Sequence, residues 1–201
     1  MVCGGYMQKE LSEMSLDELW RLFPIILRDH NPECINWYKE EEKRLQNLLN
    51  KIDIARINHI GSTAVNGLIA KPTVDILLEL KSNADVELLS KLLKQDCWIL
   101  MHSEKDKLNL IFNKGYTEHG FAEKVYHLHV RYHEDWDELY FRDYLIAHGD
   151  IASEYALLKL TLKIQYEHNR DAYTSGKSSF IAECTQKARI EFSKRYKTEC
   201  L

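Results

Sequence analysis

The sequence predicts a single domain with an α+β fold, and three observations support this prediction. Short apolar runs typical of strands fall between residues 54 and 131. From Asp135 onward the apolar residues recur at helical spacing. Eight Gly and three Pro in 201 residues leave no room for a long linker. We therefore expect one domain over residues 1–201, with a helical extension over 1–22 and C-terminal helices over 135–201 packing on the sheet.

The N-terminal part is expected to be largely helical. A weakly ordered lead over 1–14 precedes Ser15 and Glu18, which match a capping box and predict a helix ending before Pro24. Residues 24–27 form an apolar run that fits an edge strand. A longer helix is predicted to begin near Glu33. Residues 39–44 form its solvent side, and its apolar side comprises Ile35, Tyr38, Leu45, Leu48 and Leu49.

The predicted sheet and the C-terminal helices follow. A helix over 84–94 interrupts the strands, and loops are expected over 63–71 and 115–123. The predicted strands are 54–60, 73–80, 98–102, 108–112 and 125–131. The predicted C-terminal helices are 137–147, 151–167 and 178–196.

Charge and cysteine usage narrow the classes of partner. The formal net charge of −4 argues against a nucleic-acid binder, although a local basic pocket for a small anion is compatible with it. Five scattered cysteines without a C-x-x-C pair indicate free thiols in a reducing compartment. No signal-peptide pattern or long apolar run occurs, so we expect a cytoplasmic protein with no membrane span.

The first candidate site is the Gly61-Ser62 turn, continued by Thr63 at the end of a predicted strand. Glycine lets backbone N–H groups approach an anion closely, and the serine hydroxyl adds a donor. Such a turn can bind phosphate. An ordinary strand-ending turn explains the same residues.

The second candidate is Asp75, which lies inside an apolar strand. An ionised carboxylate there is costly unless it is paired or bound to metal. Strand alternation places Asp75, Leu77 and Glu79 on one face, with Glu79 expected to be a solvated charge near the strand end. Asp75 is either a functional metal ligand or base near Ser62, or a structural carboxylate that caps a loop.

The third candidate is the pair His127 and His129. Alternation puts both imidazoles on one face of a strand, where they could share a metal ion or bind an anion. Two partly exposed histidines on a sheet explain the same spacing.

Basic residues in the helical part could add to such a site. Arg142 could reach an anion or pair with a carboxylate. Lys159 and Lys163 are expected on a solvated helix face. Gly176-Lys177-Ser178 lacks the upstream glycine and strand of a P-loop, so Lys177 is retained only as a possible anion ligand.

Taken in order, these segments resemble the GrpB family, whose fold is nucleotidyltransferase-like. The resemblance rests on H-I-G-S-T-A-V from His59, G-L-I-A-K-P-T-V-D-I from Gly67, H-L-H-V from His127 and F-R-D-Y-L from Phe141. Tyr155, Lys159, Tyr173, Gly176, Lys177, Phe180 and Ile181 extend it, so that it covers roughly residues 24–192. The family motif usually has Pro at the position of Asn66.

The resemblance implies a mixed sheet flanked by helices and an anion pocket that includes Lys71. In the wider superfamily the Gly-Ser turn holds a triphosphate, and carboxylates in a D-x-D pattern plus a third hold two metal ions. Here Asp75 fits the first carboxylate, but Leu77 replaces the second, and His127 and His129 occupy the strand of the third. Such donors suit zinc, manganese or iron better than magnesium, or no metal.

Three functions follow as hypotheses. The first is an enzyme that acts on a nucleotide or phosphorylated metabolite, with Asp75, His127 and His129 as catalytic or divalent-metal residues. Its phosphate ligands would be Gly61, Ser62, Thr63, Lys71, Arg142 and Lys177. The second is a non-catalytic nucleotide-binding or regulatory protein on a degenerate transferase scaffold, and the third a protein-interaction module. Relatives joined to a dephospho-CoA kinase domain imply a CoA-related metabolite as a further candidate ligand.

Overall fold

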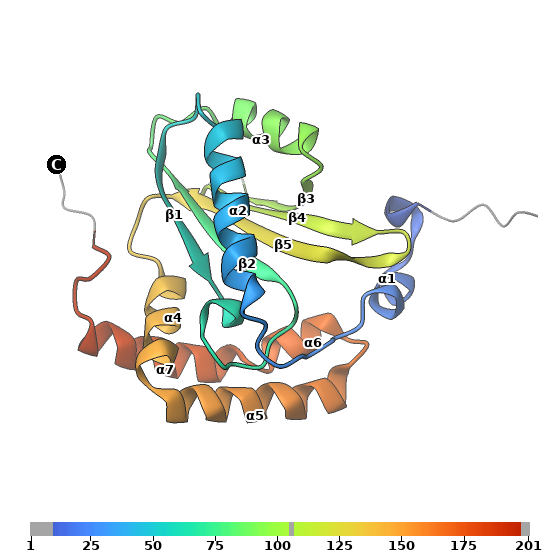
Figure 1. The fold of residues 1–201 in the computed structure, drawn as a ribbon, viewed down its shortest axis with the longest axis vertical. Coiled ribbons are helices and arrows are strands. Elements are labelled where there is room, and N and C mark those ends of the chain that lie inside the picture. The colour runs from blue at the N-terminus through green and yellow to red at the C-terminus, as the bar shows by residue number, and fades with distance from the viewer. Residues whose placement is uncertain (1–9, 105–106, 198–201) are drawn as a thin grey trace, which may run out of the picture.

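The computed structural model describes residues 10–104 and 107–197, and a five-stranded mixed sheet lies at its centre (Figure 1). Its strands are β1 Ile54–Ile60, β2 Val74–Leu80, β3 Ile99–Glu104, β4 Asn109–Thr117 and β5 Gly120–Tyr132. Their order across the sheet is β1-β2-β5-β4-β3. β2 and β5 are parallel, and every other neighbouring pair is antiparallel. The α+β class expected from the sequence is confirmed.

The pleat of the central strands separates an apolar face from a polar face. Val74, Ile76 and Leu78 alternate with Asp75 and Leu77 along β2, and only the first set joins the main core. Register then aligns the polar positions, because Asp75 pairs with His127 on β5, which pairs with Asn113 on β4. The polar face therefore carries a row of hydrogen-bonding side chains that crosses three strands.

Helices α2 (Glu33–Leu48) and α3 (Val86–Gln95) cover the apolar face (Figure 1). Leu45, Leu89 and Leu93 from these helices are fully buried against the strands. Two positions of α2 differ from the prediction. Ile35 is exposed. Glu41, on the predicted solvent side, is buried, and its carboxylate is compensated by a hydrogen bond from Lys114 Nζ at 2.8 Å.

The helices that follow β5 in the described residues form a second layer beside the sheet (Figure 1). They are α4 (Asp137–Ala147), α5 (Gly149–Tyr166), α6 (Arg170–Ser175) and α7 (Ser178–Glu191). Leu139 of α4 packs on Ile60 and Leu77, while α5 packs through Tyr155 on the loop after β1. These helices pack mainly on one another, on one edge of the sheet and on that loop, so a cavity remains between them and the rest of the polar face.

The N-terminal segment differs in part from its prediction. Residues 1–9 of the expected lead lie outside the described residues, and a 3-10 turn, Leu11–Glu13, precedes α1 (Leu16–Leu22). The capping box of Ser15 and Glu18 is confirmed. The edge strand predicted over 24–27 is wrong. Ile25 is instead buried against Leu162 and Tyr173, and only one bridge, from Arg28 to Ala70, forms nearby.

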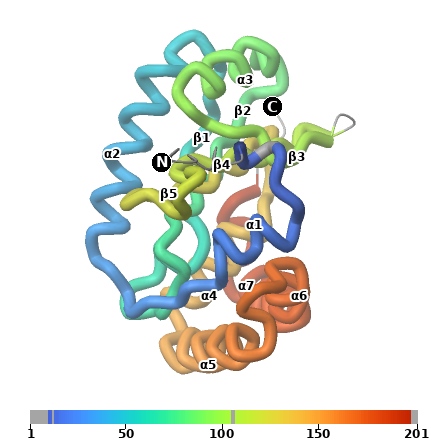
Figure 2. The backbone as a smooth tube through the Cα atoms, turned by 90° about the vertical axis from the view of Figure 1, so that its right-hand side faces the viewer, coloured from blue at the N-terminus to red at the C-terminus, as the bar shows by residue number. Residues whose placement is uncertain are grey.

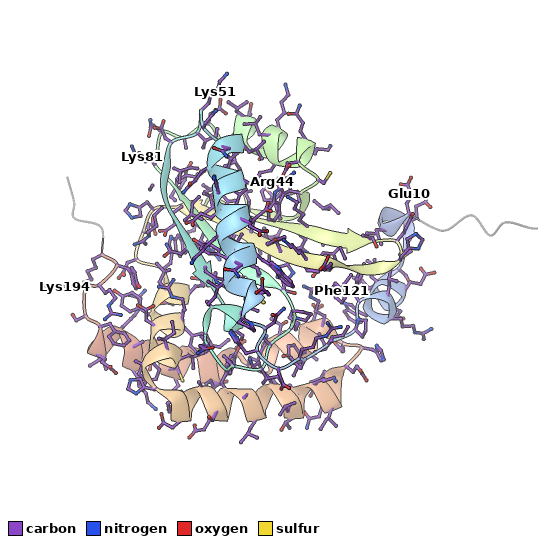
Figure 3. The ribbon with its side chains drawn as sticks, viewed as in Figure 1. Glu10, Arg44, Lys51, Lys81, Phe121 and Lys194 are labelled. Atoms are coloured by element: carbon purple, nitrogen blue, oxygen red, sulfur yellow. The ribbon has the colours of Figure 1, made fainter. Side chains whose placement is uncertain are left out.

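The loop predicted over 115–123 is a β-hairpin. The β4–β5 ladder continues past a bulge at Gly115 to a pair between Thr117 and Gly120. Gly115 has φ of 90°, and a Cβ there would lie 2.3 Å from the carbonyl oxygen of Lys124, so the glycine marks a bulge rather than the end of a strand. Phe121 lies at the end of this hairpin (Figure 3) and packs 5.0 Å from the ring of Phe23.

The helix boundaries show two further differences. The sequence predicted no helix at α6, and α7 ends at Glu191 rather than at residue 196. In the part of the chain described, no helix combines the length and apolar character that a membrane span requires. Cys34, Cys97 and Cys184 are free thiols, as expected, whereas Cys3 and Cys200 lie outside the described residues.

Candidate functional site

A cavity of about 1430 Å³ lies between the polar face of the sheet and the C-terminal helices. Residues of α1 also line it, and Figure 2 shows this helix beside the sheet and above α6 and α7. Most of the residues singled out in the sequence meet in this cavity although they are far apart along the chain. Those that line the cavity are Gly61, Ser62, Thr63, Lys71, Asp75, His127, His129 and Lys177. Arg142 does not line it.

The Gly61-Ser62 turn lies directly against Asp75. β1 ends at Ile60, which pairs with Asp75 on β2, and Gly61 then turns the chain with φ of 71°. A Cβ at Gly61 would lie 2.4 Å from Oδ2 of Asp75. Glycine is therefore required both by the backbone conformation and by the space that the carboxylate occupies.

Asp75 begins a chain of hydrogen bonds through His127. The two residues are cross-strand neighbours, and Nδ1 of His127 lies 3.0 Å from Oδ1 of Asp75. On the other side of the ring, Nε2 lies 2.7 Å from the hydroxyl of Tyr116 and 3.3 Å from an Arg170 nitrogen. Arg170 also donates to the Tyr116 hydroxyl at 3.1 Å.

The ionisation of Asp75 fixes the direction of these bonds. Burial alone would raise the pKa of its carboxyl group, but the hydrogen bond from His127 and the nearby positive charges lower it to about 2. Burial lowers the pKa of His127, opposed by Asp75. The ionised carboxylate can only accept, so a neutral His127 carries its proton on Nδ1, and Nε2 accepts from Tyr116.

Lys159 of α5 contacts the Gly61-Ser62 turn on the side away from Asp75. Its ammonium group donates to Ser62 Oγ at 3.0 Å and to the carbonyl oxygen of Ile69. The residue is only 2% exposed, so the expected solvated helix face is wrong here. Burial, with the positive charges of Lys177 and Lys71, lowers the pKa of Lys159 to about 7.

The side chain of Thr63 has a structural role and does not offer a free hydrogen-bond donor to a ligand. Its hydroxyl donates to the carbonyl oxygen of Thr73 at 3.0 Å and lies 3.0 Å from Nε2 of His59. Burial lowers the pKa of His59 to about 4, so the imidazole is neutral and Nε2 can donate to Thr63. The side chain of Thr63, predicted as a phosphate ligand, therefore has its only hydrogen committed within the protein.

Lys71, Arg170 and Lys177 complete a group of four cations with Lys159. Burial lowers the pKa of Lys71 to about 7, helped by the charges of Arg170 and Lys177 and opposed by Asp75. Burial also lowers the pKa of Lys177. Three of these cations lie over tyrosine rings: Lys159 on Tyr155 at 4.7 Å, Lys177 on Tyr173 at 4.5 Å and Arg170 on Tyr116 at 5.7 Å.

These four cations lack carboxylate partners. Among the residues described, Lys71, Lys159, Arg170 and Lys177 form no ion pair, whereas Arg189, at another part of the cavity wall, pairs with Asp135 and Asp137. Asp75 is the carboxylate at their end of the cavity, and it is bound to His127. The local charge is therefore positive in a protein whose net charge is −4.

The expected metal site of Asp75, His127 and His129 does not form. Both ring nitrogens of His127 are engaged, one by Asp75 and one by Tyr116. Within residues 10–104 and 107–197, no three His, Cys, Asp or Glu side chains are placed to share a metal ion. These donors therefore do not fit a divalent metal.

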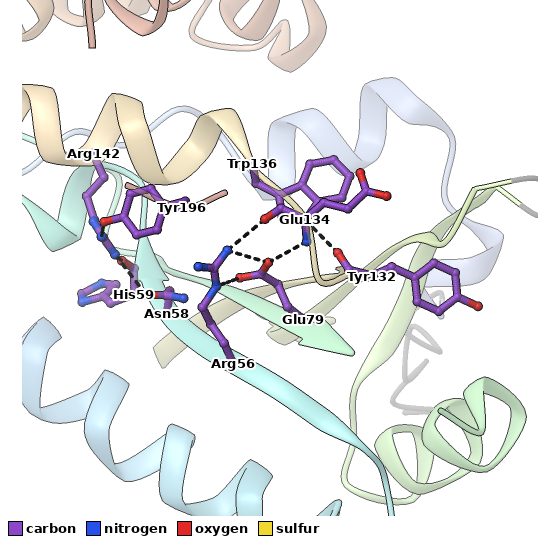
Figure 4. A network of polar contacts seen from close by, with 9 residues as sticks. All are labelled: Arg56, Asn58, His59, Glu79, Tyr132, Glu134, Trp136, Arg142 and Tyr196. Carbon is purple, nitrogen blue, oxygen red and sulfur yellow. Dashed lines mark hydrogen bonds and ion pairs between the residues drawn. The ribbon is translucent and has the colours of Figure 1, made fainter. Parts of the chain in front are cut away.

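The prediction of Arg142 as a phosphate ligand also needs correction. Its side chain belongs to a network of hydrogen bonds at the edge of the sheet (Figure 4). Its guanidinium donates to the carbonyl oxygen of His59 at 2.9 Å and to the hydroxyl of Tyr196 at 2.9 Å. It also pairs with Asp143 at 2.7 Å. Of the two alternatives the sequence left open, the structure shows the carboxylate pair.

Glu79 belongs to the same region and is not the solvated charge that was expected. It is fully buried, and its carboxylate pairs with Arg56 across the β1–β2 ladder (Figure 4). Arg56 donates in addition to the carbonyl oxygen of Glu134 at 3.0 Å, and Glu134 N–H donates to Glu79 at 3.4 Å. This network connects the sheet edge to the segment that leads into α4.

Sequence reasoning missed the roles of Lys159, Arg170 and Tyr116. Lys159 shares a helix face with the buried Tyr155 and Leu162, and a lysine within an apolar stripe was an available signal. Arg170 belongs to the short helix that the sequence did not predict. Tyr116 fell in a segment predicted to be a loop, so its side chain could not be placed on the polar face.

The fold and this site define an α+β protein whose mixed sheet opens, on its polar face, into a cavity with four cations that form no ion pair within the described residues. The chain belongs to the GrpB family, since the family model described as "GrpB protein" matches residues 24–187. The resemblance stated from the sequence motifs is thereby confirmed.

Curated relatives agree with this assignment. The chain is 31% identical over 163 residues to "Glutamate-rich protein GrpB" of Alkalihalophilus pseudofirmus, covering 79% of this chain and 92% of that protein. It is 32% identical over 165 residues to "UPF0157 protein YqkA" of Bacillus subtilis, covering 80% of this chain. The match spans only 46% of the length of YqkA.

A solved structure supports the fold. The crystal structure of conserved protein GrpB from Enterococcus faecalis superimposes with a TM-score of 0.71, covering 83% of this chain and 99% of that one. At 24% sequence identity, this likeness concerns the fold alone.

Proposed function

We propose that this protein binds a nucleotide or another phosphorylated metabolite, with the phosphate held among Lys71, Arg170 and Lys177 beside the Gly61-Ser62 turn. The supporting observation is the convergence on one cavity of four cations that have no carboxylate partner among the residues the structure describes. Buried or partly buried cations are normally paired, because an unpaired charge loses hydration without compensation. A polyanionic ligand supplies the missing partner.

Lys159 stabilises this site from a buried position next to Ser62. It is too buried to lie at the open surface, yet its ammonium group binds Ser62 Oγ and keeps this hydroxyl at the cavity wall. A phosphate near Ser62 would therefore meet a serine hydroxyl already polarised by a cation. Charge-assisted hydrogen bonds of this kind are about twice as strong as those between neutral groups.

Titration calorimetry with pyrophosphate at pH 7 tests the proposal. We expect the affinity to fall about tenfold in Lys71→Gln and in Lys177→Gln, because each loses a charge-assisted bond of about 1.5 kcal/mol. Lys94→Gln is the matched control, since this exposed lysine lies on α3 at the opposite face of the sheet. Absence of binding to the wild type, or an equal loss in Lys94→Gln, would contradict the proposal.

The affinity should also depend on pH. With pKa values near 7, Lys71 and Lys159 lose their protons in the free protein as the pH rises from 7 to 9. Burial is the main cause of both lowered pKa values; the charged groups that add to it are Arg170, Lys177 and Asp75 around Lys71, and Lys177 and Lys71 around Lys159. A bound anion favours the protonated lysines, so binding should weaken above pH 7 and take up protons, which the buffer dependence of the enthalpy reports.

A second candidate function is catalysis of nucleotidyl or phosphoryl transfer, favoured by the chain from Asp75 through His127 to Tyr116. Asp75 fixes the tautomer of His127, so Nε2 is a proton acceptor whose partner in this structure is the Tyr116 hydroxyl. His127 can act as a general base only if a substrate displaces that hydroxyl from Nε2. Leu77 in place of a second carboxylate favours binding without catalysis. Product formation that Asp75→Asn abolishes would decide for the enzyme; ligand binding without product would decide for the non-catalytic alternative.

A further inference from the structure

We infer that the ligand of this cavity is an amphipathic phosphate ester: an anionic head group with an extended apolar chain lying over β4 and β3. This inference deepens the proposed function and rests on it. It follows from how the cavity changes in character between its two ends.

The floor of the cavity is a row of cross-strand neighbours on the polar face. Asp75 pairs with His127, His127 with Asn113, and Asn113 with Ile99. Three inter-strand spacings separate Asp75 from Ile99, which is a distance of about 14 Å. Along this row the side chains pass from a carboxylate and an imidazole to an amide and then to an aliphatic group.

The side chains that line the cavity from β3, and Ile111 from β4, are apolar. Ile99 and Met101 of β3 and Ile111 of β4 form the floor of the cavity at this end of the sheet, and Leu19 and Trp20 of α1 also line it. Figure 2 shows α1 beside this end of the sheet, with α6 and α7 below it. The four unpaired cations come instead from α5, α6, the segment between α6 and α7, and the loop before β2.

Several apolar side chains at this end remain exposed. Leu16 is 65% exposed, Ile99 43% and Met101 59%, and all three line the cavity. Apolar surface gathered at one place, next to a charged pocket, is typical of a ligand-binding site rather than of a bare surface. An apolar chain continuing from a phosphate held at Lys71 and Lys177 would cover these side chains.

A nucleoside fits this end less well. A nucleobase presents several donors and acceptors at its edge, and burying them without partners is unfavourable. Leu19, Ile99, Met101 and Ile111 offer none from their side chains, which leaves only the Trp20 indole N–H and the Asn113 amide among the lining residues named here. An aliphatic chain has no such requirement, and its affinity grows with each methylene group that is removed from water.

The test is a series of alkyl phosphates, from methyl to octyl, measured by titration calorimetry below their micelle-forming concentrations, with AMP and pyrophosphate alongside. We expect the affinity to increase about fourfold for each methylene group that becomes fully buried. Octyl phosphate should then bind at least about tenfold more tightly than butyl phosphate and more tightly than AMP.

Substitutions at the exposed apolar positions test where the alkyl chain of the ligand binds. Leu16→Gln and Met101→Gln should reduce the gain in affinity from methyl to octyl phosphate. Leu157→Gln is the matched control, because Leu157 is 66% exposed on α5 but does not line the cavity, and this variant should keep the full gain. Circular dichroism and thermal unfolding confirm that each variant is folded.

The outcomes separate this inference from the proposed function. If pyrophosphate and methyl phosphate bind but longer chains bind no better, the inference is overturned and the phosphate site stands. Tighter binding of AMP than of octyl phosphate would likewise overturn it in favour of a nucleobase. If Leu16→Gln and Met101→Gln keep the full gain in affinity from methyl to octyl phosphate, the alkyl chain binds elsewhere and the inference is overturned. If no phosphate compound binds, both proposals fail.

Discussion

At the scale of single residues, Gly61 shows how one position can satisfy two demands. Its φ of 71° is rarely adopted by residues that carry a Cβ, and the space a Cβ would take is filled by the Asp75 carboxylate. Asp75 is in turn held by His127 at 3.0 Å. A side chain at Gly61 would therefore disturb both the turn and the hydrogen-bond chain behind it.

Gly61→Ala should be destabilised by about 2 kcal/mol or more, since backbone strain and a steric clash act together. Gly67→Ala is the matched control: Gly67 has φ of 76°, but nothing lies within 4 Å of the position that a Cβ would take there. The control should lose only the strain contribution, about 1 kcal/mol. Urea unfolding measures the loss of unfolding free energy in both variants. Equal losses would show that the steric contact with Asp75 does not contribute to the cost of Gly61→Ala.

The sequence allowed several site residues to be predicted at this scale, but not their partners. Asp75 was recognisable because a carboxylate inside an apolar strand needs an explanation, and His127 because alternation placed it on the same kind of face. The partners Lys159 and Arg170 lie 97 and 43 residues away in sequence from Ser62 and His127, respectively. Such pairings arise from tertiary packing, which local spacing does not encode.

At the scale of elements, the ion pair between Arg56 and Glu79 joins the edge strand β1 to β2 and to the segment before α4. Glu79 is fully buried, so its charge depends on Arg56 for compensation. Removing one partner leaves the other uncompensated, whereas removing both leaves no buried charge.

Arg56→Met should therefore cost about 3 to 5 kcal/mol of unfolding free energy, and the double variant Arg56→Met/Glu79→Leu should be less destabilised than the single one. A double-mutant cycle of urea unfolding at pH 7 measures the difference. Additive losses in the two single variants would contradict a coupled, buried pair.

Most elements could be predicted from periodicity, and the errors have identifiable causes. The helix over 137–147 was predicted with its observed bounds. Residues 24–27 were misassigned because an apolar run fits both a strand and a buried extended segment. Gly115 was taken to begin a loop although it forms a bulge within a strand. The six residues of α6 are too few to show a helical period.

At the scale of the whole molecule, the α+β class followed from the order of strands and helices, but the cavity did not. The C-terminal helices were expected to pack on the sheet. They contact it mainly through Leu139 of α4 and otherwise pack on each other and on the loop after β1. The polar face beyond α4 therefore stays uncovered, and the cationic side chains of the helical layer point into the space that remains.

The central claim is that this space holds an anion at the four unpaired cations. The most direct measurement is a crystal structure of the protein soaked in tungstate, with the heavy anion located by its anomalous signal. We predict one tungstate within hydrogen-bonding distance of Lys71, Arg170 or Lys177 and beside Ser62, and its loss in Lys71→Gln/Lys177→Gln. Tungstate bound only elsewhere on the protein, or unchanged in that variant, would contradict the claim.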